Sequence, residues 1–233
     1  ASDFTFVFVG SFDPDSIRYF SQQYLANLPK VRRNDSPVDD NYNIRTGKHE
    51  KVFAKKMTQP QCRMLMLLTS PVKNTLKNEI ATDMVGQILS MRLLETIREE
   101  MGAAYSVGAL GVFVPTSSGD FSGSLQIQAP VKPELVDTCR QVIDQELKAL
   151  ATNGAEEKYI QKVKEYLLKS SKENDRDTSA WLEWLMSMDY YNADKYTGYE
   201  AIVQNLTSED IRKAAAPLLE AGNAITVVIT PEQ

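Results

Sequence analysis

The chain has 233 residues, of which 42% are hydrophobic and 24% charged, a composition typical of a soluble globular protein. This length allows one large or two small domains, each able to bury a hydrophobic core. The net charge of −5 argues against a nucleic-acid or anionic-membrane partner, because those partners need a basic surface. No apolar run approaches the roughly 20 residues of a membrane span.

The chain opens with a predicted strand and helix. Residues 4–9, FTFVFV, are strand formers, and the first ten residues lack the basic start and apolar stretch of a signal peptide. Because the chain has no initiator Met, we expect a fragment or a processed product. Asp13 and Pro14 predict the N-cap and first position of a helix over 14–27 that ends at Pro29.

A polar, aperiodic segment follows and gives way to two strands. Residues 30–50 are interpreted as a linker or a long exposed loop, and they contain the single histidine, His49. Residues 51–57 alternate between apolar and polar side chains, as an ordinary strand does. Residues 61–70 are more continuously apolar, which indicates a central strand.

The remaining elements follow from apolar spacing and from turn residues. A long helix is predicted from a cap at Asn74 to Glu100, with Gly102 as its left-handed C-terminal cap. The turn PTSSGD joins two strands into an antiparallel hairpin. The later strands are predicted at 105–114, 119–130 and 224–230, and the later helices at 135–152, at 155–174 and after a cap at Thr178. A last helix is predicted at 207–219, with a Thr207–Asp210 capping box and a kink or end at Pro217.

This order of elements predicts an α+β fold with two layers. We expect a mainly antiparallel sheet with helices packed on one face, namely those near 74–100, 135–152 and 155–174. The first strand, FTFVFVG, also resembles the last, AITVVIT, in pattern. Tandem repeats would produce this similarity if the chain began with the tail of one repeat and ended at the same point of the next.

The sequence lacks the motifs of a self-sufficient catalytic site. It has one histidine, no paired cysteines, no H-x-x-E-H, no G-x-S-x-G and no phosphate loop. We therefore predict that the chain binds no zinc stoichiometrically, because a zinc site needs three or four ligands. Glu99 and Glu100 are adjacent, so on a helix they point in different directions. Cys62 and Cys139 are predicted to be buried free thiols, with one disulfide left open as an alternative.

One stretch places functional side chains at a junction between elements. In TIREEMGAAYSV, Arg98 ends the long helix, Gly102 stops it and Tyr105 begins the next strand. A purely structural interpretation is available for both side chains. An arginine in the last helical turn is stabilised by the helix dipole by about 0.3–1 kcal/mol, and a tyrosine at a strand start can simply pack.

The same stretch resembles a family signature. MRLLETIREEMGAAYSV is similar to the second-repeat motif of the pitrilysin, insulin-degrading-enzyme and mitochondrial-processing-peptidase family, with Arg-Leu, Arg-Glu, Gly and Ala-Tyr-Ser in order. Met91 departs from the small residue often found there. The opening FTFVFVGSFDPDSIRYFSQQYLANLP and the ending NLTSEDIRKAAAPLLEAGNAITVVITP also resemble parts of such repeats, so the resemblance covers most of the chain.

The resemblance implies a division of labour between two homologous repeats. In this family the first repeat carries an inverted H-x-x-E-H zinc site, whereas the second has no metal and offers an arginine and a tyrosine to the peptide. By motif position these are Arg98 and Tyr105. It also implies a tail of the preceding repeat at 1–29, a linker or loop at 30–50 and a zinc-free repeat at 51–233.

The implied function is that of the C-terminal, metal-free half of a zinc metalloendopeptidase, inactive alone. Its partners would be a peptide or protein substrate and a zinc-bearing repeat in cis or in another subunit. The compartment that we expect for it is the bacterial periplasm or the cytoplasm. A phenol O–H can donate to the oxyanion of peptide hydrolysis, and an arginine can hold a carbonyl or carboxylate. One alternative is a non-catalytic scaffold or peptide-binding subunit of the same fold. Another, with only the α/β pattern behind it, is a small-molecule binding module.

Overall fold

The computed structural model describes residues 4–30, 45–57, 61–115 and 121–232. The chain divides into two units. The larger comprises Asn41–Leu168 and Gly198–Gln233, and the smaller comprises Ala1–Asp40 and Lys169–Thr197. The larger unit contains the sheet, most of the hydrophobic core and both residues of the predicted site.

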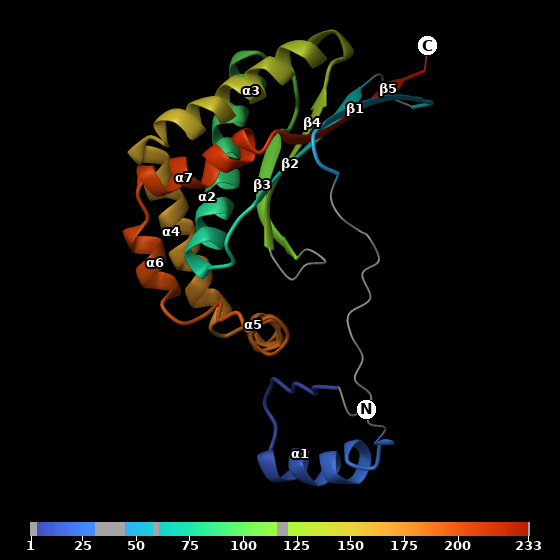
Figure 1. The fold of residues 1–233 in the computed structure, drawn as a ribbon, viewed down its shortest axis with the longest axis vertical. Coiled ribbons are helices and arrows are strands. Elements are labelled where there is room, and N and C mark those ends of the chain that lie inside the picture. Colours follow the sequence, from blue (N-terminus) through green and yellow to red (C-terminus); the bar gives the residue numbers. More distant parts are fainter. Residues whose placement is uncertain (1–3, 31–44, 58–60, 116–120, 233) are drawn as a thin grey trace. The chain divides into compact units, whose positions relative to one another are not determined.

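A five-stranded sheet runs through the larger unit (Figure 1). In spatial order its strands are β1 (Lys48–Lys55), β5 (Asn223–Pro231), β2 (Cys62–Pro71), β4 (Phe121–Val131) and β3 (Gly108–Pro115). Neighbouring strands are antiparallel except β1 and β5, which run parallel. The predicted α+β fold with a mainly antiparallel sheet is therefore confirmed, and the predicted hairpin is β3–β4.

One face of the sheet is covered and the other is open. In β2, Cys62, Met64 and Met66 are buried, whereas Arg63 and Leu65 between them are exposed. Successive side chains of a strand point to opposite faces, so this alternation separates a helix-covered face from an open one. The central position predicted for residues 61–70 is confirmed, because β2 pairs with both β4 and β5.

The helices of this unit gather on one side of the sheet (Figure 1). They are α2 (Leu76–Leu93), the 3-10 turn η3 (Pro133–Leu135), α3 (Val136–Asn153), α4 (Glu157–Asn174, which belongs to this unit up to Leu168), α6 (Tyr199–Asn205) and α7 (Ser208–Glu220). Direct contacts with the sheet come mainly from α2 and α7, and α3 packs against both. The helix at 155–174 was predicted to cover the sheet, but α7 packs against the sheet in its place. α4 contacts α6 instead, where Lys164 donates a hydrogen bond to the carbonyl of Gln204.

The backbones of α2 and β3 touch at two glycines. A Cβ on Gly86 would lie 2.2 Å from the Gly111 nitrogen, and a Cβ on Gly111 would lie 1.9 Å from the Thr82 carbonyl oxygen. The missing side chains therefore permit this approach. Ser90 reinforces it, because its Oγ accepts from the Ala109 N–H at 2.6 Å and donates to the Ala109 carbonyl at 2.8 Å.

Two predictions near the start of the chain are wrong. Residues 4–9 form no strand, and they find no hydrogen-bonded strand partner among the described residues. A strand needs such a neighbour, however favourable its composition. The predicted loop at 30–50 also runs too far, since β1 already begins at Lys48 and includes His49. Residues 31–44 of that loop lie outside the described residues.

Helix caps lie within one residue of their predicted places. The cap of α2 is Thr75 rather than Asn74, because the Thr75 Oγ1 accepts from the Asn78 N–H. Asp177 rather than Thr178 caps α5 (Thr178–Tyr191). Each predicted cap has a polar neighbour that can also cap a helix, namely Thr75 beside Asn74 and Asp177 beside Thr178. The path of the backbone in the fold selects between the two. Pro217 does not end α7, which continues to Glu220, and the short helix α6 was not predicted.

The smaller unit contains α1 (Pro14–Phe20), a following π-helical turn η1 (Ser21–Leu25) and α5. The predicted N-cap at Asp13 is confirmed, since its carboxylate accepts from the Ser16 N–H at 2.8 Å. Trp181 and Trp184 of α5 form an aromatic cluster with Tyr196, in which the ring centroids lie 4.9–5.2 Å apart.

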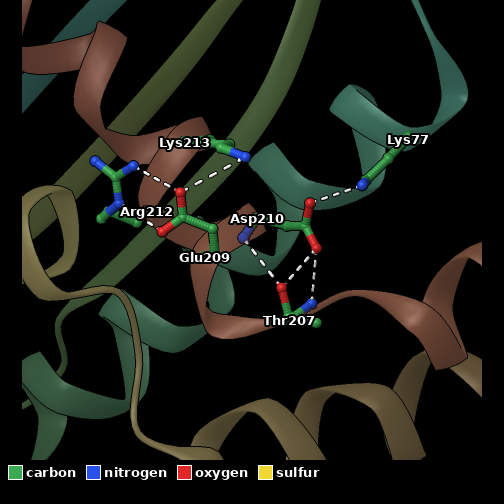
Figure 2. Close-up of polar contacts among 6 residues, drawn as sticks. All are labelled: Lys77, Thr207, Glu209, Asp210, Arg212 and Lys213. Atoms are coloured by element: carbon green, nitrogen blue, oxygen red, sulfur yellow. Dashed lines mark hydrogen bonds and ion pairs between the residues drawn. The ribbon is translucent and has the colours of Figure 1, made fainter.

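The predicted capping box of α7 is confirmed (Figure 2). The Thr207 N–H donates to the Asp210 carboxylate at 2.9 Å, and the Asp210 N–H donates to the Thr207 Oγ1. The Lys77 ammonium of α2 lies 2.7 Å from the same carboxylate. Burial alone would raise the Asp210 pKa, but the bonds from Lys77 and Thr207 outweigh it and lower the pKa. The box therefore also joins α7 to α2.

We expect Asp210→Asn to destabilise the protein at neutral pH but not in acid. A carboxyl whose pKa is lowered on folding stabilises the fold above its unfolded pKa of about 3.9, and this contribution is lost as the pH falls through the folded pKa. The melting temperature of the variant should therefore lie below wild type at pH 7 and converge with it in strong acid. Asp189→Asn, an exposed carboxylate on α5, controls for the lost charge. A gap that stays constant with pH contradicts the assignment.

Gly111→Ala should lower the free energy of unfolding by about 2–3 kcal/mol, because the new methyl group overlaps the α2 backbone. Gly108→Ala is the matched control in the same strand. There, the nearest atom to an added Cβ is the Ser90 Oγ at 4.0 Å, and a loss below about 1 kcal/mol is expected. Urea denaturation of both variants measures the difference. Equal losses would show that the close approach is not a constraint.

Candidate functional site

The C-terminal end of α2 widens into a π-helix. This segment, η2 (Leu94–Glu100), continues α2 directly, so the predicted helix length is correct. In η2, Ile97 is fully buried, whereas Arg98 and the two following glutamates are exposed. π-helical turns are rare and are frequent at functional sites. The sequence predicted a regular helix here and gave no sign of the wider turn.

Contacts from two neighbouring helices hold the end of α2 in place. The Arg92 Nε lies 2.5 Å from the Glu146 carboxylate of α3, and both side chains are only 19% exposed. On α4, the Tyr159 hydroxyl donates a hydrogen bond to Glu95 of η2. Arg92 of the sequence motif thus has a structural contact, and the helix that bears Arg98 is fixed on two sides.

A tightly bonded turn leads out of η2. Gly102 adopts the left-handed conformation with φ +58°, which confirms the predicted glycine cap. The Ala103 N–H donates to the Ile97 carbonyl at 2.9 Å, and the Ala103 carbonyl accepts from the Lys132 N–H at 3.2 Å. Ala104 forms a β-bridge with Val131. The turn is therefore tied both to the helix behind it and to the end of β4.

The structure brings Arg98 and Tyr105 together at the surface. The guanidinium carbon of Arg98 lies 5.9 Å from the centroid of the Tyr105 ring, and Tyr105 is 84% exposed. Such a cation–π contact is worth about 0.5–1 kcal/mol at an exposed site. Tyr105 does not begin a strand as predicted, since β3 starts at Gly108. It lies instead on the pinned turn.

Tyr105 also lines a hollow on the open face of the sheet. The hollow has a volume of about 740 Å³ and lies over β2, β3 and β4. Its polar lining includes Gln61, Arg63, Gln126 and Gln128. None of these lining residues was predicted from the sequence, although the alternation along each strand carries the signal that their side chains share the open face.

The other candidate residues do not form a site. His49 is exposed on β1, and its Nε2 lies 2.8 Å from the Thr46 carbonyl oxygen. Cys62 and Cys139 are buried and free, as predicted, and burial raises the pKa of both thiols. Within the part of the chain that the structure describes, no three or more His, Cys, Asp or Glu residues are grouped as metal ligands. The described residues therefore do not fit a zinc ion.

A match to a protein-family model shows to which family the chain belongs. The family model described as the Peptidase M16 inactive domain matches residues 1–167, which include η2 and Tyr105. The chain belongs to the M16 peptidase family. The resemblance inferred from the sequence motif is thus confirmed. No curated protein sequence matches this M16 domain.

Solved structures of proteases share the fold of this M16 domain. The ferredoxin protease FusC, solved with Arabidopsis ferredoxin, matches with a TM-score of 0.74 and 17% identity over 95% of the chain. The periplasmic protease PqqL from Escherichia coli matches with a TM-score of 0.74 and 19% identity over 96% of the chain. A protease from Helicobacter pylori matches with a TM-score of 0.78 and 16% identity over 96% of the chain. The chain spans 24%, 25% and 54% of these three proteins, respectively.

Among the helices that the structure describes, none combines the length and the apolar character needed to span a membrane.

Because both site residues are exposed, we expect their removal to leave the fold intact. Arg98→Ala loses the exposed cation–π contact and should lower the free energy of unfolding by at most about 1 kcal/mol. Tyr105→Phe keeps the ring and should change it by less than about 0.5 kcal/mol. Ile97→Ala, at the buried position beside Arg98, is the control and should cost about 2–5 kcal/mol. Chemical denaturation compares the three variants. A loss for Arg98→Ala or Tyr105→Phe as large as that for Ile97→Ala supports the purely structural interpretation.

Proposed function

We propose that this M16 domain is the metal-free half of a zinc metallopeptidase. In this proposal it binds peptide substrate and positions it for hydrolysis at a zinc site carried by another repeat. The observation that carries the proposal is the exposed Arg98–Tyr105 pair on a pinned turn beside a hollow in the open sheet face. The pair contributes little to packing, yet both residues are held on rigid elements, as positioning requires.

Tyr105 is proposed to stabilise the charge that develops during peptide hydrolysis. The carbonyl oxygen of the scissile bond becomes negative as the bond is attacked, and a phenol O–H can donate to that oxygen. A fixed donor of this kind is worth roughly 2.7–4 kcal/mol in comparable sites. The hydrogen bonds of Ala103 and the bridge of Ala104 fix the backbone immediately before Tyr105, so the donor is held without reorganisation.

Arg98 is proposed to hold the peptide in both the ground state and the transition state. Its guanidinium is permanently charged and presents several donors to a carbonyl or carboxylate oxygen. The contact with the Tyr105 ring keeps the guanidinium beside the phenol. A peptide carbonyl bound by Arg98 would therefore lie close to the group that Tyr105 is proposed to polarise.

The zinc ion of this proposal belongs to a different repeat. The described residues of this chain do not fit a zinc site, and the family model that matches is itself that of an inactive domain. The similar solved proteases are about two to four times as long as this chain, which leaves room in proteins of that length for a homologous repeat. The zinc-bearing repeat is proposed to lie in the same polypeptide or in a partner subunit.

In the intact enzyme, Tyr105→Phe should lower kcat by about 100-fold with little change in KM, because the phenol bond forms mainly as charge develops. Arg98→Ala should raise KM as well, because the guanidinium also binds the ground-state peptide. Tyr166→Phe, an exposed tyrosine on α4, is the matched control. Steady-state turnover of a fluorogenic peptide measures all three.

Unchanged turnover in Tyr105→Phe would overturn the catalytic role. If the intact protein then binds peptides without hydrolysing them, the scaffold or peptide-binding alternative is supported instead.

A further inference from the structure

The strands of the sheet are almost free of acidic residues, although the chain has a net charge of −5. Their single carboxylate is Glu50 of β1. Its two oxygens accept hydrogen bonds from the Arg140 guanidinium of α3 at 2.7 and 3.1 Å. Glu50 is therefore directed to the helix-covered face, and the strands place no acidic side chain on the open face.

Several cations occupy the open face instead. Because side chains alternate along β1, Lys51 and Lys55 point away from the face that holds Glu50. The Lys51 ammonium lies 5.0 Å from the centroid of the Phe53 ring, as expected for two residues on one face. In β2, Arg63 is exposed between the buried Cys62 and Met64. Positive charge is thus concentrated on the side of the sheet that carries the hollow.

Among the described residues, Arg63 is the only charged one that lines the hollow, and it forms no ion pair with any of the others. Amide side chains of Gln61, Gln126 and Gln128 share the lining, and Tyr105 belongs to the same wall. A guanidinium with neighbouring amide N–H groups matches the oxygens of a carboxylate. A lysine or arginine side chain of a ligand would find no acidic partner among the described residues that line the hollow.

We infer that the open face selects peptides with an acidic side chain, which Arg63 and the neighbouring glutamine amides bind beside the bond whose developing charge Tyr105 is proposed to stabilise. The inference rests on the proposed function for the role of Tyr105 and adds the substrate class. Leu65 and Leu110, 37% and 54% exposed, offer apolar contacts in the same hollow. The negative net charge of the chain favours a peptide over a nucleic acid, which needs a continuous basic surface.

The test is direct binding to the 233-residue chain. Three short fluorescein-labelled peptides differ only at one central residue, which is Glu, Gln or Lys. Fluorescence anisotropy should give a Kd for the Glu peptide about tenfold below that for the Gln peptide, with the Lys peptide weakest, and added salt should reduce the difference. Arg63→Glu should reverse the order of the Glu and Lys peptides. Lys148→Glu, with the same charge change at an exposed position on α3, should preserve it.

Equal affinities for the Glu and Gln peptides, or no binding of any peptide, would overturn the inference. It is also overturned if a single-stranded oligonucleotide binds as tightly as the Glu peptide and loses affinity equally in Arg63→Glu, because the face is then a general polyanion surface. The assay involves no hydrolysis. Failure of the charge preference is therefore distinguishable from failure of the proposed function, which the turnover of Tyr105→Phe decides.

Discussion

The contact between the backbones of α2 and β3 is the constraint on which the site depends. Gly86 and Gly111 allow the two elements to touch, and Ser90 bonds to both backbone groups of Ala109. The short connection from η2 to β3 then has both ends fixed. A rigid connection of this length cannot place Arg98 far from Tyr105, so packing distant from the side chains sets their separation.

The two faces of the sheet have opposite physical tasks. The covered face buries apolar side chains against α2 and α7, and its acidic residue is neutralised by Arg140. The open face has exposed polar and basic side chains, and the helices of the larger unit lie on the other side of the sheet (Figure 1). In the proposed enzyme this face is available to a peptide, because no element of the described larger unit fills the hollow. The buried face supplies stability and leaves the open face free to bind.

Membership of the M16 family as an inactive domain gives the missing metal ligands a consistent meaning. A half without metal can still contribute donors to the transition state, and one fixed hydrogen bond of this kind lowers a barrier by roughly 2.7–4 kcal/mol. Division between repeats also separates two physical requirements. One repeat would supply the metal, and this one would supply the substrate-facing donors and, as inferred from Arg63, a preference for acidic side chains.

The sequence alone determined the fold class, most helices and strands, the Thr207–Asp210 capping box, the glycine cap at Gly102 and the family motif, because these depend on local spacing and turn chemistry. The tertiary structure decided the rest. The π-turn of η2, the loss of a strand at 4–9 and the place of α7 on the sheet depend on which distant segments pair or pack. The charge of the open face has the same origin, since it arises only when strands far apart in sequence lie side by side. The short connection between Arg98 and Tyr105 keeps their backbones near each other, but the packing of the turn decides the contact of their side chains.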